Sequence, residues 1–160
     1  MPRRGTKEVL QIPSETTDPA RKLVPKGAHV NSQRICVVIE DDADIRDLIA
    51  LILSGAGFEV HACETANEGV TAAERLNPVL ITLDLGLPDM DGREAARLIT
   101  AVSQAPILMI TAFAERDDEL HGIASGATAY LIKPFRPRQL RELALKLSPQ
   151  ELTSPDPCST

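Results

Sequence analysis

The sequence predicts an α/β fold in which helices cover both faces of a parallel β-sheet. Short apolar runs alternate five times with amphipathic stretches between residues 34 and 147, a pattern typical of successive strand–helix units. Apolar residues form 43% of the chain, but Trp is absent and aromatic residues make up only 2%. The core must therefore consist of Leu, Ile, Val and Ala, which suits a parallel sheet buried on both faces.

The strands and helices are expected in strict alternation. Strands are predicted at 35–39, 58–62, 79–83, 107–110 and 129–132, and helices at 43–54, 66–76, 92–101, 116–125 and 137–147. Asp42 is expected to cap the first helix. Gly55 and Gly57 after the first helix, and Gly126 after the fourth, lie where a left-handed cap or a tight turn is needed. Units of this kind are joined by right-handed crossovers.

The length of 160 residues favours one domain with a flexible segment on each side. Residues 1–33 are polar and interrupted by four prolines, so they are expected to be a flexible N-terminal extension. Residues 148–160 contain three more prolines and are expected to be a flexible tail. The folded domain is then 34–147, and we expect no effector domain after it, because the remaining residues lack a helix-turn-helix pattern.

Charge and cysteine content exclude several classes of function. The net charge is −6, and residues 34–147 hold eleven basic against eighteen acidic side chains, which argues against a nucleic-acid surface. Cys36, Cys63 and Cys158 lack metal-site or disulfide spacing, and two of them, Cys36 and Cys63, lie in apolar strand-like runs, which indicates buried, reduced thiols. No signal-peptide pattern or membrane-length apolar run is present. We therefore expect a cytoplasmic protein that binds neither nucleic acid nor membrane directly.

Unusual polar residues follow four of the five predicted strands. They are Glu40, Asp41 and Asp42 after the first strand, Asp84 after the third, Thr111 in the fourth and Lys133 after the fifth. Taken singly, each has an ordinary structural explanation, such as a helix cap or a loop residue. Because ligands bind beyond the carboxyl ends of parallel strands, these side chains are expected to meet in one crevice.

Several carboxylates in one crevice repel one another unless a cation lies among them. Glu40, Asp41 and Asp84, with a loop carbonyl, offer the oxygen ligands that Mg²⁺, or alternatively Mn²⁺, prefers. Lys133 would add a positive charge and Thr111 a hydroxyl donor for a phosphoryl group. Asp84 is then the candidate nucleophile that forms an acyl phosphate, a reaction that depends on positioning and charge screening more than on a general base.

Four segments of the chain resemble the receiver domains of two-component response regulators. They are residues 35–42, 83–92, 110–112 and 133–135, which lie at the ends of strands one, three, four and five. The resemblance covers residues 34–147. It implies a flavodoxin-like, doubly wound (βα)5 sandwich with a five-stranded parallel sheet in the order 2-1-3-4-5.

The resemblance also implies the roles of the site residues. Asp84 would be the phosphoacceptor and a metal ligand, with Asp41 a direct ligand, Glu40 a ligand mainly through water, and Gly86 a ligand through its backbone carbonyl. Thr111 and Lys133 would contact the phosphoryl group. The peptide bond between Lys133 and Pro134 is expected to be cis. The domain would not be an enzyme in the ordinary sense, but would assist its own phosphorylation and dephosphorylation.

Switching and partners are implied by the same resemblance. On phosphorylation Thr111 would move toward the phosphoryl group and Tyr130 would turn inward, changing the surface of helix four, strand five and helix five. A Tyr that merely covers a strand edge is an equally good reading of Tyr130. The donor would be a histidine kinase or a histidine phosphotransfer protein docking on the exposed face of the first helix, which carries Asp44, Arg46 and Asp47; these charges fit a solvated helix surface equally well. The output would be a downstream protein target. Thr128 and Ala129 replace the acidic pair of a common dimer face, so a monomer or weak homodimer is expected.

Three alternatives stay open at this point. A haloacid dehalogenase-like phosphatase would need a second Asp two residues after its nucleophile, where this sequence has Gly86. The chain could instead be a degenerate receiver that binds proteins without being phosphorylated, although the acceptor Asp, the acidic pair and the Lys are all present. It could also be the receiver fragment of a longer DNA-binding regulator.

Overall fold

The computed structural model describes residues 33–112 and 126–149 of the chain. Five strands form one parallel sheet: β1 (Ile35–Ile39), β2 (Glu59–Cys63), β3 (Leu80–Leu83), β4 (Ile107–Thr111) and β5 (Ala129–Ile132). Their order across the sheet is β2-β1-β3-β4-β5. The predicted parallel sheet and its strand order are confirmed. The predicted fourth helix, 116–125, lies outside the described residues.

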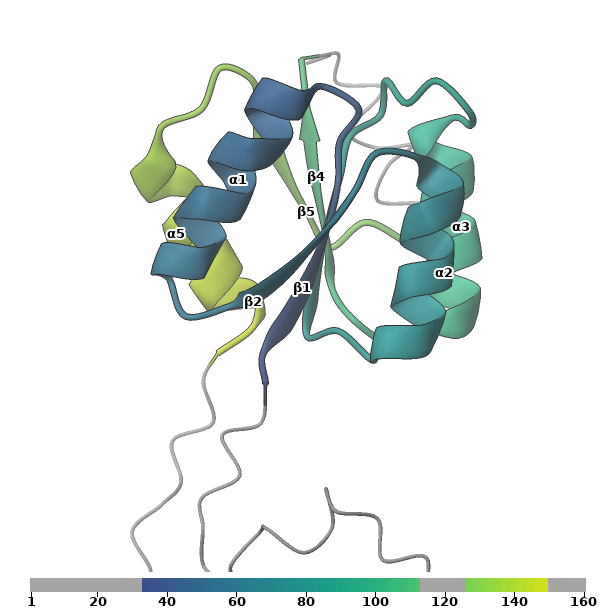
Figure 1. The fold of residues 1–160 in the computed structure, drawn as a ribbon, viewed down its shortest axis with the longest axis horizontal. Helices are drawn as coiled ribbons and strands as arrows, with labels where there is room; N and C mark the ends of the chain where they lie inside the picture. Colours follow the sequence, from purple (N-terminus) through teal and green to yellow (C-terminus); the bar gives the residue numbers. More distant parts are fainter. Residues whose placement is uncertain (1–32, 113–125, 150–160) are drawn as a thin grey trace, which may run out of the picture. The chain divides into compact units, whose positions relative to one another are not determined.

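Four described helices cover the two faces of this sheet: α1 (Ala43–Gly55), α2 (Ala66–Leu76), α3 (Gly92–Val102) and α5 (Pro137–Leu147). Figure 1 shows α1 and α5 on one face of the sheet and α2 and α3 on the other. Each face has its own apolar cluster, because successive strand residues point to opposite sides. In β1, for example, Val38 packs toward α1 and α5, whereas Ile39 belongs to the cluster under α2 and α3.

The helix ends follow from local side-chain chemistry. Asp42 accepts a hydrogen bond from the Ile45 N–H at 3.1 Å, which confirms it as the N-cap of α1. Gly57 and Gly126 adopt the positive φ expected of them, while Gly55 is the last residue of α1. Asn77, for which no left-handed cap was predicted, ends α2 in a left-handed conformation at φ 47°.

Four strand boundaries differ from the prediction by one residue. β2 begins at Glu59 because the N–H of Phe58 still bonds to the Leu53 carbonyl in the turn that closes α1, at 3.1 Å, and it ends at Cys63. β3 begins at Leu80. β4 extends to Thr111, whose carbonyl accepts the Lys133 N–H at 2.8 Å. This last extension links the two strands that carry Thr111 and Lys133.

The described part of the chain is an α/β layer structure with a Leu- and Ile-rich interior. None of its helices combines the length and the apolar character that crossing a bilayer requires. Fully buried Leu and Ile side chains fill the interior, and each contributes roughly 2 kcal/mol through burial. The interior of the sheet is thus well packed, and the residues that follow the carboxyl ends of its strands lie along one edge.

Candidate functional site

The polar residues predicted to converge lie at the carboxyl edge of the sheet. Glu40 directly follows β1, Asp84 follows β3, Thr111 ends β4 and Lys133 follows β5. Backbone hydrogen bonds set them side by side, because the Asp84 N–H donates to the Ile39 carbonyl at 3.1 Å. Parallel pairing of four neighbouring strands thus gathers residues that are far apart in sequence.

Three carboxylates form a compact cluster at this edge. Oxygen atoms of Glu40, Asp41 and Asp84 all lie within 4.8 Å of one another. Glu40 is 1% exposed and Asp84 7% exposed, whereas Asp41 is open to solvent. Among the residues that the structure describes, this is the one group of three acidic, His or Cys side chains close enough to share a metal ion.

Lys133 bridges two of the three carboxylates. Its Nζ lies 2.7 Å from Glu40 Oε2 and 3.2 Å from Asp84 Oδ2. Burial alone lowers the pKa of the ammonium, but the hydrogen bond that Lys133 donates to Glu40 and the charges of Asp84 and Glu40 outweigh it, so the pKa of Lys133 is raised. The peptide bond to Pro134 is cis, as the sequence predicted. Lys133 therefore remains charged and faces the acidic cluster.

The Glu40 carboxyl group has a strongly raised pKa. Burial raises its pKa from 4.5 to about 7, and the nearby charge of Asp84 acts in the same direction, while Lys133 lowers it only in part. Three carboxylates against one ammonium leave two uncompensated negative charges when all are ionised. A single divalent cation would balance that charge.

The donor set also fits a hard divalent ion in its geometry. Oxygen atoms that share one Mg²⁺ at about 2.1 Å lie at most about 4.2 Å apart. The cluster, with its oxygens within 4.8 Å, needs only a small contraction to reach that arrangement. No nitrogen or sulfur ligand takes part, which favours Mg²⁺ or Mn²⁺ over Zn²⁺.

Arg46 holds the loop that carries two of the carboxylates. Its Nη1 donates to the backbone carbonyls of Glu40 at 2.9 Å and Asp41 at 3.2 Å. Arg46 was predicted to lie on the exposed docking face of α1, but its side chain is half-buried against the loop. Spacing alone did not reveal this contact, because it depends on how the chain turns between β1 and α1.

The loop between β3 and α3 brings Gly86 next to the Asp84 carboxylate. The Gly86 N–H donates to Asp84 Oδ1 at 3.3 Å. At the end of the loop Asp91 caps α3 by accepting the Arg93 N–H at 2.7 Å. Gly92 is required by close approach, since a Cβ there would lie 2.6 Å from Leu85 Cα and 2.7 Å from the Asp84 carbonyl oxygen. The role of the Gly86 carbonyl as a ligand remains a prediction.

The two residues of the predicted switch lie on neighbouring strands. Thr111 is completely buried at the end of β4. Tyr130 of β5 is half-buried, pairs with Met109 in the ladder and packs against the cluster under α2 and α3. These positions place both residues close to the site edge, and their movement remains a prediction.

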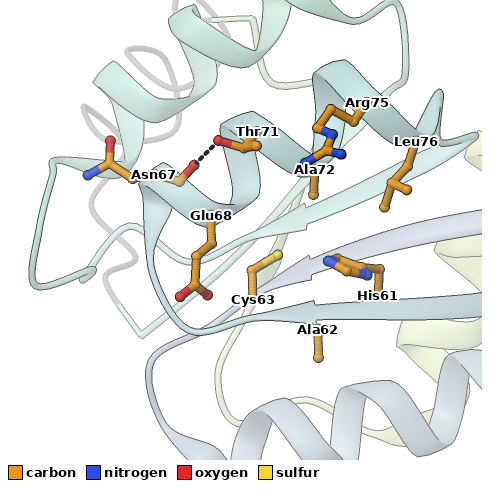
Figure 2. Close-up of a pocket in the computed structure, with 9 residues that line it drawn as sticks. All are labelled: His61, Ala62, Cys63, Asn67, Glu68, Thr71, Ala72, Arg75 and Leu76. Atoms are coloured by element: carbon orange, nitrogen blue, oxygen red, sulfur yellow. Dashed lines mark hydrogen bonds between the residues drawn. The ribbon is translucent and has the colours of Figure 1, made fainter.

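A separate pocket lies between β2 and α2. Its volume is about 600 Å³. Figure 2 shows His61 and Cys63 pointing into it from β2, while Ala62 points away. Burial raises the pKa of the Cys63 thiol to about 11, so this thiol is protonated at neutral pH. None of the predicted site residues lines this pocket.

Comparison with known proteins agrees with the geometry. The family model described as "Response regulator receiver domain" matches residues 36–145. The DNA-binding response regulator MtrA of Mycobacterium tuberculosis is 39% identical over 108 residues, which cover 68% of this chain and 47% of that protein. The transcriptional regulatory protein SrrA of Staphylococcus aureus is 37% identical over 119 residues, covering 73% of this chain and 49% of that protein.

Solved structures show the same similarity. A CheY-like response regulator receiver domain from Methanospirillum hungatei is 31% identical, with a TM-score of 0.67 and coverage of 72% of this chain and 94% of the other. The receiver domain of the sensor histidine kinase PA1611 from Pseudomonas aeruginosa is 27% identical, with a TM-score of 0.67 and coverage of 74% and 100%. In that structure a magnesium ion is coordinated in the active-site cleft.

The extent of the matches defines what they identify. This chain spans about half the length of the curated relatives it matches. The family model covers most of the folded residues and all four strands that carry the site. The fold, the site geometry and these matches together lead to one conclusion: the chain belongs to the response regulator receiver domain family of two-component systems.

Proposed function

We propose that Asp84 accepts a phosphoryl group while Glu40, Asp41, Asp84 and the Gly86 carbonyl hold a Mg²⁺ or Mn²⁺ ion. One observation carries the proposal: a half-buried ammonium, that of Lys133, bridges Glu40 and Asp84 within a cluster of three carboxylates. This arrangement keeps a nucleophilic carboxylate, a fixed cation and the ligands for a second cation within one crevice. When bound, the divalent ion supplies charge neutralisation for the carboxylates and the phosphoryl oxygens.

The reaction proposed at Asp84 is a substitution at phosphorus. A carboxylate oxygen of Asp84 forms the new P–O bond, and the bond from phosphorus to the donor's leaving atom breaks, with its electron pair departing on the leaving group. Lys133, whose pKa is raised, donates to a phosphoryl oxygen as a cation. Thr111 donates its hydroxyl hydrogen to another oxygen. The same residues would support hydrolysis of the acyl phosphate, so the domain assists both its phosphorylation and its dephosphorylation.

The donor and the output follow from membership of the family. Receiver domains interact with histidine kinases, and we infer that a histidine kinase or a histidine phosphotransfer protein supplies the phosphoryl group. Phosphorylation would then shift Thr111 and Tyr130 and change the surface around β5 and α5 that a downstream protein reads. Monomer or weak homodimer remains our expectation for the assembly, and sedimentation with and without phosphorylation would test it.

We propose that this domain does not contact DNA itself. Residues 34–147 carry eleven basic and eighteen acidic side chains, so the domain repels a polyanion. The curated relatives named as DNA-binding or transcriptional regulators are about twice as long as their match to this chain. A salt-dependent shift of duplex DNA by residues 34–147 alone in an electrophoretic mobility assay would contradict this view.

Intact-protein mass spectrometry tests the phosphoacceptor directly. We expect incubation with acetyl phosphate and Mg²⁺ to add a single phosphate to the wild type, which hydroxylamine removes because the bond is an acyl phosphate. The variant Asp84→Asn should remain unmodified, whereas Asp47→Asn, at an exposed position of α1, should still be modified because that carboxylate does not belong to the cluster. Removing divalent ions should abolish the adduct.

A failed adduct would favour a different function. If the folded wild type is never modified with any divalent ion, the chain is better described as a receiver that binds its partner without phosphorylation. A phosphate that appears on Asp84→Asn to the same extent would mean that another residue is the acceptor. Steady hydrolysis of phosphate esters would instead support the phosphatase alternative, although this chain has Gly86 where such a phosphatase needs a second acid, two residues after Asp84.

A further inference from the structure

One carboxylate of the loop between β3 and α3 is bound to a different helix. Asp89 accepts three hydrogen bonds from the start of α2: from the Ala66 N–H at 2.9 Å, the Asn67 N–H at 3.0 Å and the Asn67 side-chain amide at 2.9 Å. Ala66 and Asn67 precede Asp89 by 23 and 22 residues. The contact is therefore tertiary, and Asp89 does not belong to the acidic cluster.

The start of α2 does not depend on Asp89 for its own cap. Thr65 already accepts the Glu68 N–H at 3.2 Å and serves as the N-cap. Asp89 satisfies two further N–H groups of the first turn, which would otherwise point to water. Bonds to an ionised carboxylate at a helix N terminus are also strengthened by the helix dipole. These bonds lower the pKa of Asp89, so the carboxylate is charged at neutral pH.

The second half of the loop is thereby held at two points. Asp91 fixes the end of the loop to α3 through the Arg93 N–H, and Asp89 fixes the middle of the loop to α2. Between Asp84 and these two anchors lies Gly86, the residue expected to turn its carbonyl toward the cation. The loop after β1 is held differently, from its own helix, by Arg46.

We propose that Asp89 is a positioning residue for the divalent-cation site, fastening the Gly86 loop to the N terminus of α2 so that the site is formed before the ion arrives. The inference rests on the proposed function, because it concerns the ion that function requires. A loop that is ordered beforehand loses less conformational entropy on binding. The coupling is reciprocal, so bound ion must also strengthen the bonds that Ala66 and Asn67 donate to Asp89.

The expected effect is moderate, because Asp89 acts through the backbone of the loop. Replacing a side chain that touches a metal ligand directly typically weakens metal binding about 10- to 100-fold. Asp89→Ala removes all three bonds to α2 and should weaken Mg²⁺ binding about 5-fold, a value below that range because Asp89 does not touch a ligand. Asn67→Ala removes one side-chain bond and leaves both backbone bonds, so its effect should be smaller than that of Asp89→Ala.

Mg²⁺ titration of the full chain by calorimetry, together with amide exchange by NMR, tests this. In the wild type, Mg²⁺ should slow exchange of the Ala66 and Asn67 amides. Asp89→Ala should abolish that response as well as weaken Mg²⁺ binding. Asp47→Ala, which removes an equal charge from an exposed position of α1, should leave both unchanged. A role in stability alone would lower the melting temperature without changing the Mg²⁺ affinity.

The outcomes separate this inference from the function on which it rests. If the wild type does not bind Mg²⁺ at all, the proposed function fails and the inference fails with it. If the wild type binds Mg²⁺ but Asp89→Ala binds it equally well, only the positioning role is overturned. If Asp89→Ala does not fold, Asn67→Ala decides: weaker Mg²⁺ binding supports the inference, and unchanged binding with unchanged amide protection contradicts it.

Discussion

Replacing Glu40 by glutamine tests whether the site is destabilised by its own charge when no divalent ion is bound. Glu40 is 1% exposed, and burial raises its pKa from 4.5 to about 7. Between these two pH values the folded state keeps a proton that the unfolded chain releases. The free energy of unfolding of the wild type should therefore fall as pH rises from 4.5 through 7, and level off above. Glu40→Gln has no such proton to lose.

The size of the effect follows from the shift. A change from 4.5 to about 7 corresponds, at about 1.4 kcal/mol per pH unit, to about 3 kcal/mol. Glutamine can still accept the hydrogen bond from Lys133, but it loses the charged part of that interaction. We therefore expect Glu40→Gln to be more stable than the wild type by about 2 kcal/mol at pH 8.5 and to differ little at pH 4.5.

Urea unfolding in metal-free buffer at several pH values measures this difference. With a slope of about 2 kcal/mol per molar urea, the midpoint of Glu40→Gln should lie about 1 M higher at pH 8.5. Glu59→Gln removes the same charge from an exposed position and should show no such gain. A Glu40→Gln protein that is less stable at pH 8.5, or one whose gain does not depend on pH, would refute the reasoning. Mg²⁺ should stabilise the wild type more than this variant.

Two further substitutions examine how the backbone around the site is held. Gly92→Ala should lower the free energy of unfolding by about 1–3 kcal/mol and slow phosphorylation, because its Cβ would meet the backbone of Leu85 and Asp84 at 2.6 and 2.7 Å. The control in the same urea titration is Gly55→Ala, whose Cβ would have no atom within 4 Å. Equal effects of the two substitutions would contradict the steric argument. Asp42→Ala should lower the free energy of unfolding by about 1 kcal/mol by removing the cap of α1. Asp42→Asn keeps a hydrogen-bond acceptor and should lower it less. An equal loss of stability in both variants would mean that the cap bond contributes nothing.

The periodic pattern of apolar residues along the sequence predicted most of the secondary structure. The five strands and the four described helices lie within one residue of their predicted bounds, because short apolar runs and amphipathic stretches reflect the burial of each element directly. The convergence of Glu40, Asp84, Thr111 and Lys133 was also predictable, since parallel strands bring their carboxyl ends to one edge. The burial of Cys36 and Cys63 was predicted correctly for the same reason.

The misplacement of Arg46 shows where such reasoning stops. Its position on α1 predicts a solvent-facing side chain, and only the turn between β1 and α1 brings the guanidinium onto the carbonyls of Glu40 and Asp41. The left-handed Asn77 was missed for a related reason: Asn tolerates positive φ but does not require it. Local propensity permits these conformations, and tertiary contacts select them.

The sequence by itself determined the fold class, the strand order through family resemblance, and the residue types gathered at the site. Only the tertiary structure decided their electrostatic state: that Glu40 is buried while Asp41 is exposed, that Lys133 bridges two carboxylates, and that Asp89 binds α2 rather than the cluster. The physical reason is that patterns along a chain record which side of an element is buried, whereas pKa values and hydrogen-bond partners depend on ångström-scale distances between segments far apart in sequence.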